Sequence, residues 1–430
     1  MHWSKRLGLL FILTIAAAQV FGQASRTPFS AIGIGDIIPP SLINSRGMGG
    51  IGVSNPTIFH LNNQNPALLP FNRLTVFEIG IVGESRTINS ADVTETGGSG
   101  NLNYMATAFP LGLNKLSQKR ASTISLALQP YSFVNYRLDY TEQVTGSDVE
   151  TDVTEQGTGG FNQFALGYGI RLHKNFSVGA KLSYVFGSIN NEFSNRLTGL
   201  NVPVLFTPSI RRRDTASDIM LSGGLAYHQD SLFSNKKISL HAGITYDNPV
   251  DLNVNRFESF ERLIGTRLND VDTLTNELSG SLSIPGSIAF GVSLRNNLRW
   301  SAGVDVRLQN WSEYTNFIGE AGELGDQFRL SLGGEFTPDP SSVSSYFKRV
   351  TYRAGFNYEQ TPLIINNNQV SEIGINFGFS LPVSRFSNLN MAVQYSQRGD
   401  IQETIIEENI VRFYFGVTFN DRWFIKRKFD

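Results

Sequence analysis

The feature that most constrains this chain is a strict alternation of apolar and polar residues. The segment from Ile410 to Phe419 (IVRFYFGVTF) is a clear example. Its odd positions, beginning with Val411, are apolar, and most of its even positions, from Arg412 to Thr418, are polar or small. A helix with 3.6 residues per turn cannot separate these two sets, whereas a strand with a period of two does. The pattern therefore predicts β-strands.

The same alternation recurs along most of the chain. Each occurrence is long enough for one strand, and turn-forming residues separate them. We predict about 14 strands in all. They lie near residues 73–86, 99–109, 120–143, 158–171, 176–186, 213–229, 236–247, 277–294, 298–308, 323–337, 349–360, 373–381, 388–399 and 410–419.

The apolar face of these strands could meet either lipid or the dry centre of a soluble sandwich. The opposite faces are rich in Gly, Ser and Asn, which suits a wet lumen. The apolar faces run for five or six positions, enough for a tilted strand that crosses a bilayer. Aromatic residues lie near strand ends, as in membrane-interface girdles. These are Tyr136, Tyr140, Tyr246, Trp311, Tyr314, Tyr358 and Trp423. We predict an all-β fold, a transmembrane antiparallel β-barrel of about 14 strands with an N-terminal plug.

The connections between strands alternate in length, as in outer-membrane barrels whose short turns are periplasmic. Short connections are predicted at 173–175, 230–236, 295–297 and 383–387. Long polar loops are predicted at 191–212 and 248–276. The connection 338–348 is an exception, because it is long on the side where the others are short.

Composition and the first residues indicate export. Lys5 and Arg6 precede the uncharged run from Leu7 to Gly22, which is the pattern of a signal peptide over 1–22. We therefore expect an outer-membrane location. The formal net charge of −1 argues against nucleic acid as a partner. The absence of cysteine excludes thiolate metal sites and cysteine nucleophiles.

Residues 23–72 lack sustained alternation and are rich in Gly and Pro. A barrel of about 14 strands encloses a wide lumen, because its diameter grows with strand number. We predict that residues 23–72 form a plug inside it. A disordered leader is the alternative, and apolar residues such as Ile51, Val53 and Leu68 argue against that alternative. The barrel then spans 73–419, and 420–430 is a periplasmic tail.

Two motifs in this segment resemble a known family. RGMGGIGV (from Arg46 to Val53) and NPALL (from Asn65 to Leu69) are similar to the hatch of FadL-type outer-membrane transporters of long-chain fatty acids and other hydrophobic compounds. The resemblance implies a 14-stranded barrel with an N-terminal hatch, and it extends to IPGSIAFG at 284–291 and to the strand 298–312. The hatch residues that it implies are Arg46, Gly47, Gly49, Gly50, Asn65, Pro66 and Ala67.

The ends of the chain resemble a subfamily of such barrels that is common in Bacteroidetes. The matching segments are Thr27 to Asp36 and Arg422 to Lys428. A related barrel acts as a carrier in type IX secretion, although its hatch has an acidic residue where this chain has Gly50 and Ile51. Passive uptake of hydrophobic small molecules is therefore the first functional hypothesis. A scaffold or carrier in a protein secretion system, with secretion-machinery proteins as partners, is the alternative.

Transport of this kind needs positions that admit and release the ligand. Pro130 interrupts a predicted strand and lacks an amide donor, so we predict a kink or bulge there. It is either a lateral gate or an ordinary bend of a long strand outside the membrane. Strand parity predicts basic side chains in the lumen that could contact a carboxylate or balance acidic neighbours such as Glu335 and Glu372. The candidate ligand contacts are Lys181, Arg299, Arg307 and Arg412.

Enzyme activity is not expected. The sequence has no HExxH or GxSxG motif, and the pair of Ser239 and His241 on one strand is weak support for a hydrolase. We expect no cofactor and no metal. The expected partners are a hydrophobic small molecule or lipid, and the lipid or lipopolysaccharide of the outer membrane. The basic triplet from Arg211 to Arg213, in a predicted outer loop, is a candidate contact for lipopolysaccharide phosphates, and a solvated loop without such a contact is the favoured alternative.

Overall fold

The computed structural model describes residues 25–91, 93–111, 121–143, 146, 149–198, 206–232, 238–264, 267–296, 298–384 and 387–421. The predicted signal peptide, 1–22, lies outside these residues, as does the predicted tail from residue 422 on. None of the described helices is long and apolar enough to cross a bilayer.

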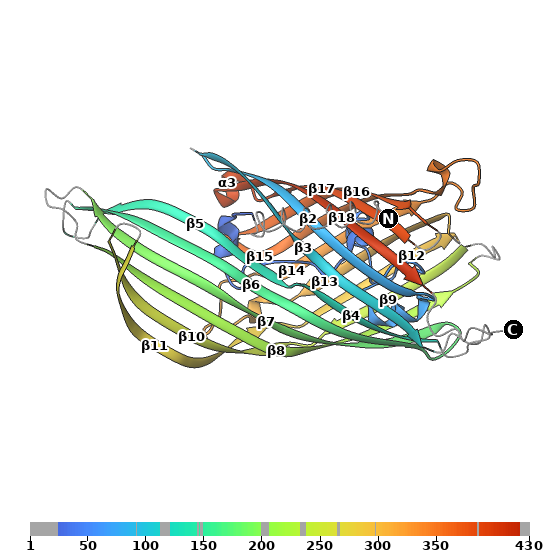
Figure 1. The fold of residues 1–430 in the computed structure, drawn as a ribbon, viewed down its shortest axis with the longest axis horizontal. Helices are drawn as coiled ribbons and strands as arrows, with labels where there is room; N and C mark the ends of the chain where they lie inside the picture. Colours follow the sequence, from blue (N-terminus) through green and yellow to red (C-terminus); the bar gives the residue numbers. More distant parts are fainter. Residues whose placement is uncertain are drawn as a thin grey trace, which may run out of the picture.

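The described strands form one antiparallel sheet that closes on itself, because the first long strand, β2, pairs with the last, β18 (Figure 1). The wall strands are β2 Thr75–Asn89, β3 Thr94–Leu111, β4 Ser122–Pro130, β5 Ser132–Gln143, β6 Glu150–Arg171, β7 Phe176–Thr198, β8 Thr207–Gln229, β9 Ile238–Asp247, β10 Val250–Ile264, β11 Arg267–Ile284, β12 Ser287–Asn296, β13 Trp300–Gln309, β14 Gln327–Phe336, β15 Thr351–Ile365, β16 Asn368–Pro382, β17 Ser387–Arg398 and β18 Glu407–Asp421. Closure of this kind pairs strand edges that would otherwise be exposed to lipid.

Three wall strands are each divided into two pieces. The breaks separate β4 from β5, β9 from β10, and β11 from β12. Pro130 directly precedes the first break, and Pro249 and Pro285 lie in the other two. Proline has no amide donor for the ladder, so strands bend or break where it occurs. With each pair counted as one strand, the described wall has 14 strands, which confirms the prediction. The last strand, β18, continues to Asp421, two residues beyond the predicted end of the barrel.

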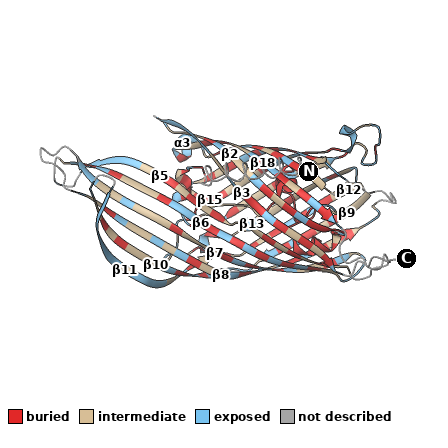
Figure 2. Cartoon of the chain, viewed as in Figure 1, coloured by how far each residue is buried: buried red, intermediate tan, exposed pale blue. Residues whose placement is uncertain are grey.

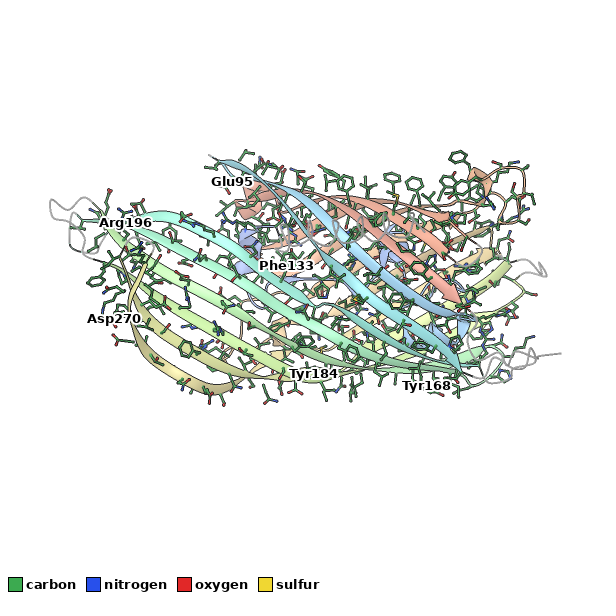
Figure 3. The ribbon with its side chains drawn as sticks, in the orientation of Figure 1. Glu95, Phe133, Tyr168, Tyr184, Arg196 and Asp270 are labelled. Atoms are coloured by element: carbon green, nitrogen blue, oxygen red, sulfur yellow. The ribbon has the colours of Figure 1, made fainter. Side chains whose placement is uncertain are left out.

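The apolar side of the strands faces outward. In β18, Phe413, Phe415 and Phe419 are exposed, whereas Tyr414 and Thr418 are buried. Tyr168 and Tyr184 likewise extend from the outer surface (Figure 3). Buried and exposed positions alternate along the strands (Figure 2). The prediction of lipid outside and a polar lumen inside is therefore confirmed, because a soluble sandwich would bury these phenylalanines.

The predicted aromatic girdle is only partly correct. Tyr140 and Tyr246 are exposed, but Tyr136, Trp311 and Tyr314 are buried. The last two belong to the connection between β13 and β14, which includes η3 (Trp311–Glu313) and folds inward against an apolar cluster. Proximity to a strand end does not determine which way a side chain points. Trp423 lies outside the described residues.

The wall is taller on one side than on the other. Strands β7 and β8 have 23 residues each, whereas β13 and β14 have 10. The long side, which includes β5 to β8, β10 and β11, extends to the left in Figure 1. The prediction of long loops at 191–212 and 248–276 was therefore wrong, since most of these residues extend the strands beyond the membrane region.

The N-terminal segment, residues 25–72, contains η1 (Pro28–Ala31), β1 (Asp36–Ile37), α2 (Ile43–Arg46) and η2 (Pro66–Phe71). Most of its residues are buried. It contacts strands all round the barrel: β1 pairs with β5, α2 packs on β16 to β18, and η2 packs on β4 and β6 to β8. The two remaining short helices are η4 (Phe347–Arg349) and α3 (Ile401–Thr404). The segment therefore lies against the inward-facing side of the wall.

Candidate functional site

The glycine-rich part of the N-terminal segment turns tightly after α2. Gly49 and Gly50 have φ angles of +71° and +96°, which only glycine adopts at low cost. Gly47 lies so close to the wall that a Cβ on it would be 3.0 Å from the Cα of Gly378. The RGMGG motif is thus a turn whose backbone contacts the barrel directly.

Glycines in the wall allow this contact. A Cβ on Gly355 would lie 2.2 Å from the backbone nitrogen of Gly49 and the carbonyl carbon of Met48. A Cβ on Gly333 would lie 2.4 Å from the backbone oxygen of Met48. The two glycines are neighbours, because Gly333 on β14 is directly opposite Gly355 on β15. The glycine turn therefore fits a side-chain-free patch on the inner wall.

Arg46 holds the turn from within. Its guanidinium donates hydrogen bonds to the backbone oxygens of Ser41 (3.2 Å) and Pro39 (2.7 Å). It also lies 5.6 Å from the ring centre of Tyr414 on β18, within the range of a cation–π contact. Arg46 is buried, so these carbonyl and ring partners, rather than water, stabilise its positive charge.

Asn65 organises the second predicted motif. Its side-chain oxygen accepts a hydrogen bond from the amide of Ala67 (3.0 Å), and its side-chain nitrogen donates to Val53 (2.7 Å). The following residue, Pro66, lies against the wall, because a Cβ on Gly179 would be 2.4 Å from its carbonyl carbon. Asn65 thus caps η2 and joins it to the glycine-rich turn.

A carboxylate of the wall binds the segment between the two motifs. Asp305 on β13 accepts hydrogen bonds from the backbone amides of Gly52 (2.6 Å) and Val53 (2.7 Å), and a longer one from the hydroxyl of Ser54 (3.4 Å). Asp305 is buried. Hydrogen bonds from amides to an ionised acceptor are stronger than neutral ones. Asp305 therefore anchors the centre of the segment to the short side of the wall.

We expect Asp305→Asn to loosen this anchor. A hydrogen bond to a charged group contributes about 1.5–3 kcal/mol, so exchange of the Gly52 and Val53 amides should accelerate by roughly tenfold or more. Hydrogen–deuterium exchange with mass spectrometry measures this directly. Asp218→Asn is the control, because Asp218 is half-buried and its hydrogen bonds within the described structure, to Ile219 and Asn253, do not involve the N-terminal segment. Equal exchange at residues 52 and 53 in both variants would show that Asp305 is not an anchor.

A cluster of ion pairs surrounds Asp36 in β1. Arg398 on β17 donates two hydrogen bonds to this carboxylate, at 2.8 and 3.0 Å, and Arg86 on β2 lies 3.6 Å from it. Arg86 also pairs with Glu84 and Glu408, and Arg398 with Glu372. A third arginine, Arg412, joins Glu84 to Glu372. Three arginines and four carboxylates therefore hold β1 where β2, β16, β17 and β18 meet.

The wall has a gap beside β1. The ladder between β3 and β4 ends at the pair Met105 and Leu128, and no described ladder joins β3 to β5. Pro130 follows two residues later. The bend is matched on β6 by Gly160, which has a φ of +128° and on which a Cβ would lie 2.4 Å from the backbone oxygen of Ser132. The edge of β5 that faces away from β6 pairs instead with β1. The structure thus places Pro130 at an interruption of the wall.

Two cavities, of about 110 and 100 Å³, lie on either side of residues 37–39. The first extends from the ion pairs around Asp36 to the gap, where its lining includes Val82, Leu102 and Pro130. The second contains Lys181, Asp247 and Arg307. Both are therefore lined in part by charged groups. A separate apolar cluster has Trp311 and Leu324 among its buried members.

Three of the four predicted ligand contacts point into the lumen, and all three have partners there. The amino group of Lys181 donates to the backbone oxygen of Asn63 (3.4 Å). Arg307 pairs with Asp247 (2.9 Å), and Arg412 with Glu84 (2.7 Å). Arg299 lies instead in the exposed turn before β13, because that strand begins one residue later, at Trp300. The lumen placement of Arg299 was therefore wrong.

Other predicted side chains are also resolved. Glu335 pairs with Arg295 and Arg353, which agrees with a ladder of charges across the lumen. The hydroxyl of Ser239 lies 3.0 Å from Nε2 of His241. The other ring nitrogen of His241 has no hydrogen-bond partner among the described residues, so no carboxylate orients this imidazole as a catalytic triad requires.

The basic triplet is mostly paired. Arg211 and Arg212 lie on β8 rather than in a loop, and they pair with Glu192 and Glu258. Arg213 donates to the side chain of Asn190. Paired guanidinium groups offer less to lipopolysaccharide phosphates than free ones would.

Sequence reasoning missed the side chains that hold β1: Arg86, Arg398, Glu84, Glu408 and Asp36. Strand parity alone could have identified them as inward-facing, because Glu84 and Arg86 are two residues apart on one strand. Their partnership depends on the register of β18 against β2, where Glu408 is opposite Ile88 and Arg412 opposite Glu84. That register is not visible in a single sequence.

The closed 14-strand wall, its lipid-facing surface and its inward N-terminal segment define the fold of the FadL-type outer-membrane channels. The toluene transporter TbuX of Ralstonia pickettii is similar, with a TM-score of 0.56 and 15% identity over 89% of this chain and 99% of TbuX. The toluene transporter TodX of Pseudomonas putida has a TM-score of 0.55 and 16% identity over 91% and 100%. A FadL homologue of Pseudomonas aeruginosa has a TM-score of 0.55 and 13% identity over 90% and 99%.

The sequence itself shows the family. The model of the BamG family matches residues 4–430, nearly the entire chain, and the chain belongs to the BamG family. A comparison with curated proteins found no match.

Proposed function

We propose that this chain is a passive outer-membrane channel for hydrophobic small molecules, such as long-chain fatty acids. The observation that carries the proposal is the cavity beside Asp36, which continues to the gap between β3 and β5. A ligand that leaves this cavity through the gap enters the membrane without crossing water. The similar proteins TbuX and TodX are toluene transporters, which supports a ligand of this class.

In this mechanism residues 23–72 are the plug, and β1 is its movable part. Only two residue pairs join β1 to β5, Asp36 with Phe133 and Ile37 with Ser132. So short a ladder is a weak attachment without the ion pairs of Asp36. Release of β1 would open the gap at Pro130. A fatty carboxylate would meet Arg412 in the first cavity, or Lys181 and Arg307 in the second, in competition with their present acidic partners.

A disulfide between β1 and β5 tests this mechanism. The sequence has no cysteine, so Ile37→Cys with Ser132→Cys introduces one pair only. The amide of Ile38 bonds the carbonyl of Tyr131, which makes the neighbouring pair 37–132 a non-hydrogen-bonded pair with close side chains. We expect oxidation to reduce uptake of a fluorescent fatty acid into proteoliposomes, and reduction to restore it.

A second disulfide is the matched control. Thr87→Cys with Thr96→Cys joins β2 to β3, where the two hydroxyls are already 3.1 Å apart. It lies within an intact ladder of the wall and leaves β1 free, so oxidation should not change uptake. Uptake that is insensitive to the 37–132 disulfide would contradict movement of β1, and the absence of uptake in every state would contradict transport.

A scaffold or carrier role in protein secretion is the second candidate. One observation favours it: β11 has a ladder only with β10 along most of its length in the described structure, and it exposes Leu268, Leu274 and Leu278 beyond the membrane region. An exposed strand edge with apolar side chains can pair with another chain. A deletion strain that loses secreted proteins but retains fatty-acid uptake would favour this role.

A further inference from the structure

The connection between β14 and β15, residues 337–350, is an ordered loop at the end of the barrel where the other described turns are short. Thr351 follows it on the same end as Thr75 and Asp421, where the chain enters and leaves the wall. In outer-membrane barrels this end is periplasmic. Figure 1 shows the loop in orange at the upper right, extending outward past the rim of the wall.

Internal hydrogen bonds give this loop a defined shape. The amide of Asp339 donates to the carbonyl of Lys348 (2.8 Å), which closes the loop at its base. The carboxylate of Asp339 accepts from the amide and hydroxyl of Ser341, and the amide of Ser345 donates to Ser342. The residues between are therefore held in place.

This shape displays apolar side chains to the outside. Val343 is 100% exposed and Phe347 is 72% exposed. Tyr346 is exposed as well, and the centres of the Tyr346 and Phe347 rings are 6.0 Å apart. An ordered loop that fully exposes apolar side chains loses the free energy of their burial unless something covers them.

The exposed side chains continue the lipid-facing surface of the barrel. The hydroxyl of Tyr352 on β15 donates to the carbonyl of Phe347 (3.2 Å). The ring centres of Tyr352 and of Phe379 on β16 are 5.8 Å apart, and Tyr352 is opposite Phe336 on β14. Phe336 and Phe379 are exposed on the outer wall at its periplasmic end. The aromatic band at this end of the wall therefore extends without interruption into the loop.

Basic residues stand beside the apolar ones. Lys348 and Arg349 are exposed, and the guanidinium of Arg349 lies 5.4 Å from the ring centre of Tyr346. Aromatic and basic side chains together are typical of segments that lie in the interface of a bilayer, where cations meet lipid phosphates. The patch has three large apolar side chains, whereas a stable protein interface involves about 20–30 residues on each side. A lipid surface therefore fits the patch better than a protein.

We propose that loop 337–350 is a membrane anchor. Val343 and Phe347 enter the boundary between headgroups and acyl chains of the inner leaflet, and Lys348 and Arg349 contact phospholipid phosphates. The anchor fixes the periplasmic rim of β14 and β15, the strands that carry the glycine patch for the N-terminal segment, at the surface of the bilayer.

The absence of cysteine makes the anchor testable with single labels. Val343→Cys and Phe347→Cys, each labelled with bimane, are placed in nanodiscs of phosphatidylethanolamine and phosphatidylglycerol, with or without lipids that carry a shallow doxyl quencher. We expect the doxyl lipids to reduce bimane fluorescence about twofold or more at both positions. Nanodiscs contain no partner protein, so quenching reports contact with lipid alone.

Asp270→Cys is the control, because Asp270 is exposed on β11 at the opposite, tall end of the barrel (Figure 3). Its fluorescence should not change with the doxyl lipids, and iodide in the buffer should quench it more than the loop labels. Loop labels that behave like the label at residue 270 would overturn the proposal and leave the patch as a site for a protein partner. The shift of the folded band on heating in gel electrophoresis verifies that each variant has formed its barrel.

Discussion

Replacing Gly355 with valine should make the barrel leak. The new Cβ would lie 2.2 Å from backbone atoms of Met48 and Gly49, far inside the contact distance of about 3.5–4.0 Å. Backbone atoms cannot yield by a change of rotamer, so the glycine turn must leave the wall. Overpacking of this kind costs about 1–3 kcal/mol, which lowers the ratio of docked to undocked segment by about 5- to 150-fold. Ion conductance across planar bilayers should rise accordingly.

A second wall glycine provides the control. A Cβ on Gly223 of β8 would meet no atom within 4 Å, and this residue is opposite the exposed Tyr246. Gly223→Val therefore makes the same chemical change on the lipid-facing side of a strand, and conductance should stay at the level of the unmodified chain. Equal conductance in the two variants would show that contact with the glycine turn does not close the lumen.

The second large effect is expected from Arg86→Met. Arg86 is 0% exposed and pairs with Glu408 at 2.6 Å and Glu84 at 2.9 Å. Methionine keeps much of the side-chain volume but removes the close counter-charge of the buried Glu408, whose other arginine, Arg398, is 3.9 Å away. Removing one partner of a buried ion pair destabilises a protein by about 3–5 kcal/mol. Reversible unfolding by urea in lipid vesicles should show a loss of this size.

An exposed arginine with a comparable partner separates burial from charge. Arg137 bonds Asp139 at 2.7 Å, but its side chain is 44% exposed. Exposed ion pairs contribute about 0–1 kcal/mol, so Arg137→Met should change the free energy of unfolding by no more than this. Similar losses in both variants would mean that the cluster around Asp36 has no special role in stability.

The sequence alone was sufficient for the barrel, because hydrocarbon on one side and water on the other impose a period of two on every wall strand. The runs ending in Phe419 and Leu381 show this directly. The extensions at 191–212 and 248–276 lack this signal, since water surrounds both of their faces and no apolar face is needed. They form strands through backbone ladders such as those between β10 and β8, which hydropathy does not reveal.

The candidate site was predictable in part. Glycine and asparagine motifs identified Arg46, Gly49 and Asn65, because a backbone that packs closely against the wall requires glycine, and glycine-rich motifs are visible in the sequence. The cluster around Asp36 has no such motif. Its arginines and glutamates resemble other inward-facing charged residues, and only the strand register shows which of them are neighbours. Arg299 shows a further limit. Strand parity predicts the direction of a side chain only inside a strand, and β13 begins one residue after Arg299.

The order of events during assembly follows from which residues hold the N-terminal segment. Thr27 bonds Glu408, 381 residues away, and Asp36 bonds Arg398, 362 residues away. Contacts between residues so distant along the chain form late and slowly. The first described residues of the polypeptide therefore gain their partners only after the last hairpin has been synthesised and joined to the first strand. Closure of the wall and docking of the N-terminal segment are therefore one cooperative final step.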